Sequence, residues 1–188
     1  VRKFIYEMQY NFVILHHQNA MTTMVIQPSH IERLNECISK ASRTVIVTHM
    51  KPDGDAVGSS LGMYHTLKVY GKSAKIAFTN PAPASISFLT EGNPDILIYE
   101  DMKDETEKAI LEADLIICLD FHAFHRTGDL ETPLAESKAK KILIDHHLDP
   151  DRSLYDLSFS KNDISSASEL LFWILMATPQ IDGKAENL

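Results

Sequence analysis

The sequence THMKPDGDAVGSS, residues 48–60, joins a short apolar run to a segment whose apolar residues have helical spacing. The run before it, 45–47, is typical of a buried strand, and the segment after it, 61–71, ends on a glycine as helices often do. In open α/β sheets, turns between a strand and a helix form ligand sites. This turn contains one imidazole and two carboxylates, those of His49, Asp53 and Asp55.

Two carboxylates in so short a turn allow two interpretations. At an effective dielectric near 20, carboxylates about 4 Å apart repel each other by roughly 4 kcal/mol, so a cation between them would stabilise the turn. Alternatively, Asp53 and Asp55 only cap the following helix, as Asp often does. The turn alone does not decide between these interpretations.

The composition limits the classes of protein to consider. The 188 residues suffice for one domain with a sizeable core, and the hydrophobic content of 44% is typical of a soluble globular protein. The formal charge of −8 argues against binding of long nucleic acid, although a bound divalent cation would still attract phosphate. The two cysteines form no CxxC pair and no apolar run could span a membrane. We therefore expect a cytoplasmic protein with reduced thiols.

The first residues differ from the rest of the chain. The apolar run 12–15 is too short for the core of a signal peptide. Because the chain starts on Val1 and has methionines at Met21 and Met24, we predict that residues 1–23 are a leader or a non-native start that is poorly ordered. The folded domain is then expected over residues 24–188.

Segments with strand and helix patterns alternate along the rest of the chain. The strands are apolar throughout and rich in β-branched residues, so the sequence predicts an α/β fold with a parallel β-sheet and helices on both faces. Strands are expected at 45–47, 75–79, 96–99, 115–119 and 141–144. Helices are expected at 29–41, 61–69, 86–89, 105–112, 131–139 and 165–176.

Three of these strands end in side chains that bind metals. The first leads into residues 48–60, the strand 115–119 is followed by Asp120, and the strand 141–144 is followed by Asp145-His146-His147. The carboxyl ends of parallel strands lie on one edge of a sheet, so these groups can converge. Capping does not explain such a convergence, and the sequence therefore predicts a metal site. Histidine mixed with carboxylates suits divalent manganese, iron or cobalt, and zinc also accepts such ligands.

These three groups resemble motifs I, II and III of the DHH phosphoesterase superfamily. The turn His49-x-x-x-Asp53-x-Asp55-Ala-x-Gly-Ser, the isolated Asp120 and the triplet 145–147 match those motifs in order and spacing. The resemblance runs from about Ile31 to Met176 and includes Ser-Ser-Ala-Ser-Glu at 165–169. The chain is most similar to the bacterial oligoribonuclease and pAp-phosphatase type, whose members are also called exopolyphosphatase-related or RecJ-like.

The resemblance implies a hydrolase with two metal ions. Two Mn²⁺ ions are expected in the full-length protein, with Mg²⁺ or Co²⁺ as alternatives. By the family's pattern His49 and Asp53 hold one ion, Asp55 and His146 hold the other, and Asp120 bridges them.

Other residues receive roles in the reaction from the same resemblance. His147 would contact the phosphate or help the leaving oxygen, and Asp145 would orient an imidazole from the second shell of the metal site. Arg126 matches an arginine of the family pattern that contacts phosphate, but it is equally well explained as a surface arginine. Ser59 and Ser60 could donate hydrogen bonds to a phosphate from the start of their helix.

The chain departs from the family's pattern after the third motif. Members continue with a fourth motif, an Asp at a strand end, and with a C-terminal domain that binds substrate, and neither precedes Leu188. We therefore expect residues 24–188 to be an incomplete DHH domain or a natural short form. In either case the second metal is expected to bind weakly, and hydrolysis by this piece alone is not assured.

Two classes of function follow. The first is a phosphoesterase in which two metals activate a water. It would hydrolyse short oligonucleotides (nanoRNA) to mononucleotides, or 3′-phosphoadenosine 5′-phosphate to AMP, with pyrophosphatase and polyphosphatase activities as alternatives. The second is a non-catalytic module that binds a nucleotide or a metal. The expected partner is a short oligonucleotide or a phosphonucleotide, without long nucleic acid or membrane, and homodimer formation stays open.

Overall fold

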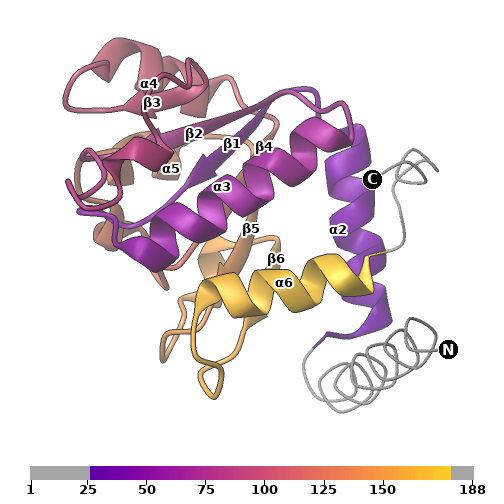
Figure 1. Ribbon diagram of the computed structural model, residues 1–188. Helices are drawn as coiled ribbons and strands as arrows, with labels where there is room; N and C mark the ends of the chain where they lie inside the picture. The colour runs from indigo at the N-terminus through magenta and orange to yellow at the C-terminus, as the bar shows by residue number, and fades with distance from the viewer. Residues whose placement is uncertain (1–25, 179–188) are drawn as a thin grey trace, which may run out of the picture.

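A computed structural model describes residues 26–178 (Figure 1), so the prediction for residues 1–23 lies outside the described residues. Six strands form one sheet in the order β3-β2-β1-β4-β5-β6, and every neighbouring pair is parallel. The predicted α/β fold is therefore confirmed. The strands are β1 (Thr44–Val47), β2 (Ala74–Phe78), β3 (Ile96–Ile98), β4 (Leu115–Leu119), β5 (Lys140–Asp145) and β6 (Leu157–Ser160). The helices are α2 (Pro28–Lys40), α3 (Gly54–Val69), α4 (Lys103–Leu111), α5 (Glu131–Glu136) and α6 (Ala167–Ala177), with 3-10 helices at Ser87–Leu89, Phe124–Leu130 and Arg152–Leu154.

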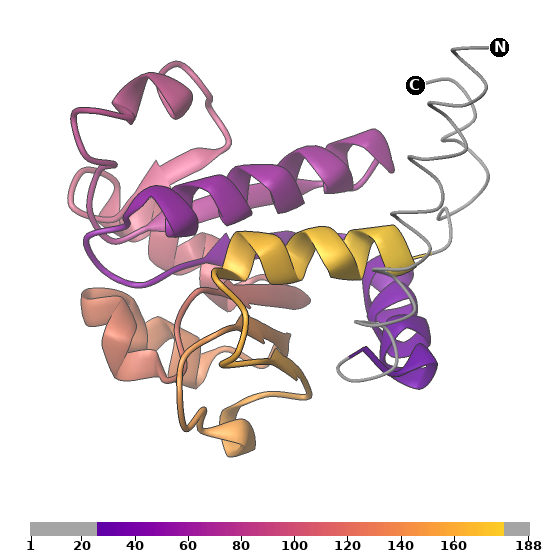
Figure 2. The same ribbon diagram turned by 60° about the horizontal axis from the view of Figure 1, so that its bottom comes forward.

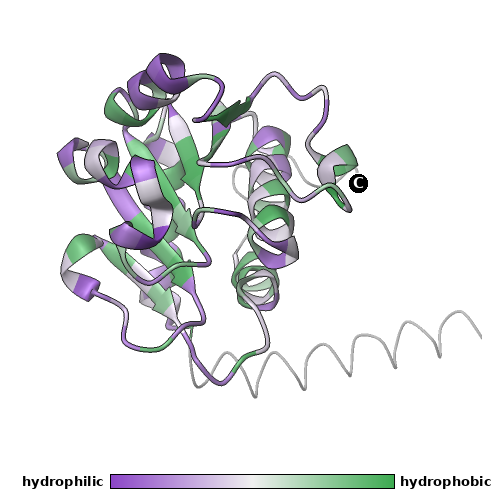
Figure 3. Ribbon diagram, turned by 90° about the vertical axis from the view of Figure 1, so that its left-hand side faces the viewer, coloured by the Kyte–Doolittle hydropathy of each residue, from purple (hydrophilic) through white to green (hydrophobic). Residues whose placement is uncertain are grey.

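Helices cover both faces of the sheet, as predicted. Side chains alternate along β1, so that Val45 and Val47 belong to the core under α4 and α5, whereas Ile46 belongs to the core under α2, α3 and α6. Figure 3 shows the apolar strands, in green, between these helical layers. None of the helices between residues 26 and 178 is long and apolar enough to cross a membrane.

The strand order reverses at β1, which pairs with β2 on one side and with β4 on the other. Ligands of open α/β sheets bind outside the carboxyl ends of the strands at such a switch point. The register places Val47 beside Cys118, and Leu119 beside Ile144. The residues that follow β1 and β4 and the residue that ends β5 therefore meet on one edge.

The helix after β1 starts earlier than predicted. It begins at Gly54 and not at Leu61, because the Asp53 carboxylate accepts hydrogen bonds from the first free amides of the helix, those of Asp55 and Ala56. The first turns of α3 contain small residues and lack the large apolar side chains from which helical spacing is recognised. At the other end of the fold, the helix expected over 131–139 ends at Glu136.

One strand, β6, was not predicted. Its residues alternate, with Leu157 and Phe159 buried and Ser158 and Ser160 half-exposed. Such alternation is expected of a strand with one covered face. The prediction relied on continuous apolar runs, which identify the central strands but miss this edge strand.

Candidate metal centre

Asp120 lies at the centre of the carboxyl edge, directly after β4. Its side chain is only 3% exposed, and its backbone has a φ of 65°. Few residues other than glycine adopt this left-handed conformation, although Asp tolerates it better than most. The buried Oδ1 atom of Asp120 has no hydrogen-bond partner among the described residues. A buried carboxylate oxygen without a partner is costly, and a cation would satisfy it.

The first group of candidate ligands consists of His49, Asp53 and Asp120. His49 Nε2 lies 3.6 Å from Asp120 Oδ2 and 3.9 Å from Asp53 Oδ1. His49 Nδ1 lies 2.9 Å from the carbonyl oxygen of Met50. Since that carbonyl can only accept, Nδ1 carries the proton and Nε2 is left free to bind a metal.

Asp53 both caps α3 and faces His49. Its Oδ1 atom accepts hydrogen bonds from the amides of Asp55 and Ala56, at 2.9 and 3.0 Å. Asp53 thus caps α3, whereas the carboxylate of Asp55 accepts hydrogen bonds from α6 instead. The cap does not compete with the metal interpretation, because an ionised carboxylate has about four acceptor positions.

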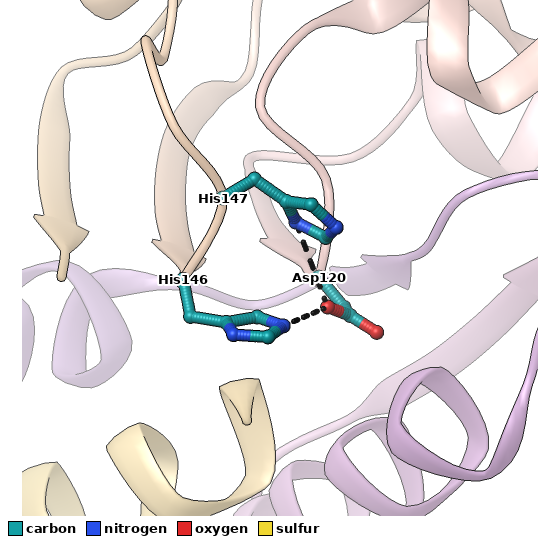
Figure 4. A group of neighbouring side chains, drawn as sticks. All are labelled: Asp120, His146 and His147. Carbon is teal, nitrogen blue, oxygen red and sulfur yellow. Dashed lines mark ion pairs between the residues drawn. The ribbon is translucent and has the colours of Figure 1, made fainter. Parts of the chain in front are cut away.

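The second group consists of Asp120, His146 and His147 (Figure 4). His146 Nε2 lies 3.4 Å from Asp120 Oδ1, and His147 Nδ1 lies 3.8 Å from the same oxygen. Figure 4 shows both rings directed at this carboxylate from the loop after β5. Asp120 therefore belongs to both groups, as expected of a carboxylate that bridges two ions.

The two histidines of this pair are not equivalent. His147 Nδ1 lies 2.7 Å from Asp145 Oδ1, and the side chain of Asp145 is fully buried. An Nδ1 atom that donates a proton to Asp145 has no lone pair for a metal, but the Nε2 atom of the same ring keeps one, as in His49. The bond to Asp145 therefore holds the His147 ring in place and does not exclude His147 as a ligand.

Asp55 faces the second group from the start of α3. Its Oδ2 atom lies 3.8 Å from His146 Nε2. Its two carboxylate oxygens accept hydrogen bonds from the backbone amides of Ala167 and Ser168, at 2.7 and 2.8 Å. The segment 165–169, which the sequence only associated with the family, is thus in contact with a predicted metal ligand.

The electrostatics of the centre are dominated by the carboxylates around Asp120. Burial raises the pKa of the Asp120 carboxyl above its ordinary value, and the carboxylates of Asp55 and Asp53 add to the rise while His49 opposes it. In turn the contact with Asp120 raises the pKa of the His49 imidazole. A divalent cation would stabilise a buried carboxylate, Asp120, that lies near two further carboxylates.

Ser59 and Ser60 do not fit the predicted phosphate contacts. Both side chains are buried within α3, and both hydroxyls donate to the carbonyl of Ala56, at 3.3 and 2.7 Å. α3 begins at Gly54, so these residues also lie beyond its first amides. We therefore withdraw that expectation.

The loop after Asp120 contains Arg126, for which a phosphate contact was predicted, and His122, which flanks Asp120 but is not required by the family's motif. Arg126 has an exposed side chain, and its carbonyl accepts a hydrogen bond from the amide of Met50; its contact with phosphate stays a prediction. The ring centroid of His122 lies 5.9 Å from that of His147, and its buried Nδ1 atom has no hydrogen-bond partner within residues 26–178. Its position two residues after Asp120 was the only signal in the sequence.

The residues present fit divalent metal ions. The donors are imidazole nitrogens and carboxylate oxygens, and the ligand atoms of each group lie within 4.8 Å of one another. This donor set suits manganese, iron, cobalt or zinc, and it does not by itself select one of them.

Comparison with known proteins identifies relatives of this chain. Residues 43–187 match the sequence profile of the DHH family, N-terminal domain. The chain is 31% identical over 137 residues to the bifunctional oligoribonuclease and PAP phosphatase NrnA of Bacillus subtilis (strain 168). The matched region covers 72% of this chain and 38% of that protein. It is 32% identical over 134 residues to a probable bifunctional oligoribonuclease and PAP phosphatase NrnA of Streptococcus mutans serotype c. That matched region covers 70% of this chain and 38% of the Streptococcus protein.

A solved structure resembles the fold as well. The exopolyphosphatase-related protein from Bacteroides fragilis superposes with a TM-score of 0.78 and 39% identity, over 82% of this chain and 45% of that one. The chain thus spans less than half the length of each of these three relatives.

Proposed function

This chain belongs to the DHH family, as an N-terminal domain of that family, and on this premise we propose that the whole protein hydrolyses small phosphoesters with bound divalent metal ions. The proposal depends chiefly on one observation, the two groups of metal-binding side chains that share the buried Asp120. When bound, ions at such a pair of sites polarise phosphoryl oxygens and lower the pKa of a shared water. Mn²⁺ is the proposed ion, with Mg²⁺ or Co²⁺ as alternatives.

His49, Asp53, Asp55, Asp120 and His146 are the proposed ligands. Their ligand atoms come from the strand ends of β1 and β4, the start of α3 and the loop after β5, so the sheet fixes the spacing of the two sites. The proton on His49 Nδ1 is held by the Met50 carbonyl, which keeps Nε2 directed at the carboxylates.

His147 is the proposed contact for the reacting phosphate. The hydrogen bond to Asp145 fixes its ring. When both ring nitrogens carry a proton, Nε2 can donate a hydrogen bond to a phosphoryl oxygen or a proton to the leaving oxygen. Arg126, exposed in the neighbouring loop, is the second proposed phosphate contact.

The proposed substrates are short oligoribonucleotides and 3′-phosphoadenosine 5′-phosphate. The names of the Bacillus and Streptococcus relatives, which include both activities, support this choice. The net charge of −8 agrees with a short substrate, because long nucleic acid needs a broad basic surface.

The test uses the full-length protein with Mn²⁺ and di- or trinucleotides. Release of 5′-mononucleotides is expected, and Asp120→Asn should abolish it because both ion sites lose their shared carboxylate. The matched control is Asp101→Asn, which makes the same chemical change at an exposed position and should keep full activity. A folded, metal-loaded protein that binds nucleotides without turnover would select the non-catalytic module instead.

A further inference from the structure

The Asp55 carboxylate is held by the first turn of α6. Oδ2 accepts a hydrogen bond from the amide of Ala167 at 2.7 Å, and Oδ1 accepts one from the amide of Ser168 at 2.8 Å. The hydroxyl of Ser168 also donates to the Asp55 carbonyl, at 3.3 Å. Each carboxylate oxygen therefore has one backbone donor, and the orientation of the group is fixed by a helix distant in sequence.

These amides are available because the first amides of a helix have no acceptor within it. A third amide at the start of α6, that of Glu169, has a local acceptor, because it donates to the Ser166 hydroxyl oxygen at 3.0 Å. The Glu169 carboxylate in turn accepts from the amide of Ser165 at 3.1 Å. The local capping residues thus leave the amides of Ala167 and Ser168 to Asp55, whose negative charge is favourable at a helix N-terminus.

Packing brings the two helices close enough for these bonds. Figures 1 and 2 show α6, in yellow, lying alongside α3, in purple. A Cβ atom on Gly58 would lie 3.5 Å from the Ser168 hydroxyl oxygen, and one on Gly62 would lie 3.8 Å from a methyl group of Leu171. One turn apart on α3, these glycines let the start of α6 approach Asp55.

We infer that the first turn of α6 is the positioning element for Asp55, so that docking of α6 on α3 and binding of the second ion are linked. The two amides use two of about four acceptor positions on the carboxylate, which leaves others for an ion shared with His146. Linkage is reciprocal: if docking of α6 favours ion binding, ion binding favours docking of α6 to the same extent. The inference rests on the proposed function only in that an ion binds between Asp55 and His146.

Ala167→Pro tests this inference by removing one of the two donors. Ala167 is the first residue of α6, a position where proline is favoured, and the preceding Ser166 has the extended backbone, φ −162° and ψ 159°, that a residue before proline requires. In the full-length protein titrated with Mn²⁺ in a calorimeter, we expect one ion to bind at least tenfold more weakly and the other to bind within twofold of the parent.

Ser166→Ala is the matched control. It removes the cap on the Glu169 amide and weakens α6, but it leaves both bonds to Asp55 in place. We expect a lower melting temperature with both Mn²⁺ affinities within twofold of the parent. Equal losses of affinity in the two variants, or parent affinities in a folded Ala167→Pro protein, would overturn the inference.

A second measurement covers the case in which Ala167→Pro prevents folding. Hydrogen exchange of the parent protein, followed by mass spectrometry with and without Mn²⁺, compares peptides from residues 164–172 with peptides from α2. Linkage predicts that Mn²⁺ slows amide exchange by a larger factor in the peptides from residues 164–172 than in those from α2. Equal slowing in both sets of peptides would contradict it. If the parent binds no Mn²⁺ at all, the proposed function fails, and that result is distinct from binding that is insensitive to α6.

Discussion

His147 Nδ1 lies 2.7 Å from Oδ1 of Asp145, and the Asp145 side chain is fully buried at the end of β5. The triplet 145–147 therefore contains three side chains with different contacts, although they are consecutive in sequence. Asp145 holds an imidazole, His146 offers its Nε2 atom to the ion group around Asp120, and His147 presents a fixed ring to the edge of the centre.

Asp145→Asn separates positioning from metal binding. The amide can no longer accept a charge-assisted hydrogen bond from His147 with the same strength, so the ring loses its fixed orientation. We expect kcat to fall about 10- to 100-fold, the usual effect of losing a residue that orients a site histidine. Mn²⁺ affinity, measured by calorimetry, should stay within threefold of the parent. A parallel loss of metal binding would show that His147 is a ligand.

Asp120→Asn should stabilise the metal-free protein. The buried Asp120 carboxylate has an oxygen without a hydrogen-bond partner among residues 26–178, and its burial raises its pKa, so the ionised group opposes folding. Asparagine keeps the shape, tolerates the left-handed backbone and carries no charge. In chelator at pH 9 we expect a gain of about 1 kcal/mol, and added Mn²⁺ should no longer raise the melting temperature. A less stable variant would indicate that the carboxylate is already compensated.

Gly128→Ala should weaken the first ion group. Gly128 has a φ of 61°, and a Cβ atom there would lie 3.3 Å from the Met50 sulfur. The carbonyl oxygen of Met50 lies 2.9 Å from Nδ1 of His49 and orients that ring. Displacing Met50 should loosen that imidazole and lower the affinity for one Mn²⁺ several-fold. Gly92→Ala is the control, because Gly92 has a φ of 73° with nothing within 4 Å of the added atom.

Both glycine variants should lose stability from backbone strain, and Gly128→Ala should lose more, because its φ of 61° and ψ of −126° lie outside the left-handed region that other residues can adopt. Only Gly128→Ala should change the calorimetric Mn²⁺ titration. If Gly92→Ala weakens metal binding as much, strain alone accounts for the effect and the contact with Met50 does not matter.

Tyr64→Phe gives a pH-dependent loss of stability away from the metal centre. The Tyr64 hydroxyl donates to Asp95 Oδ2 at 2.7 Å, and this bond, assisted by Lys68, lowers the pKa of Asp95. A lowered pKa adds stability above the ordinary value near 4, and that stability is lost as the pH falls through the lower, folded-state pKa. Urea unfolding should show a loss of about 1 kcal/mol at pH 7 that shrinks steadily below pH 4. A loss independent of pH would mean that packing, and not the charge on Asp95, is responsible.

The sequence was sufficient to predict five of the six strands, and the side chains that follow their carboxyl ends, because these depend on local signals. Apolar runs such as 115–119 and 141–144 are recognisable without any tertiary information, and parallel pairing brings whatever follows them to one edge. The contact between His49 and Asp120 follows directly from that geometry.

Other features depend on contacts that no local pattern contains. The first turns of α3, residues 54–60, consist mostly of small residues and so have no recognisable helical pattern of large apolar side chains. The start of α3 depends instead on the cap by Asp53. The same burial within α3 removes Ser59 and Ser60 from the site. The bonds from α6 to Asp55 join residues 112 and 113 positions apart, and neither partner has a sequence signal for the other.

The same separation has a consequence during synthesis on the ribosome. Asp55 is made early, but the amides that orient it belong to residues added 112 positions later, on the order of 10 s afterwards at typical elongation rates. Throughout that interval the nascent chain has the acidic turn without the helix that arranges it. On the proposed ligand set, tight binding of a metal by Asp55 and His146 would therefore begin only after α6 has been made.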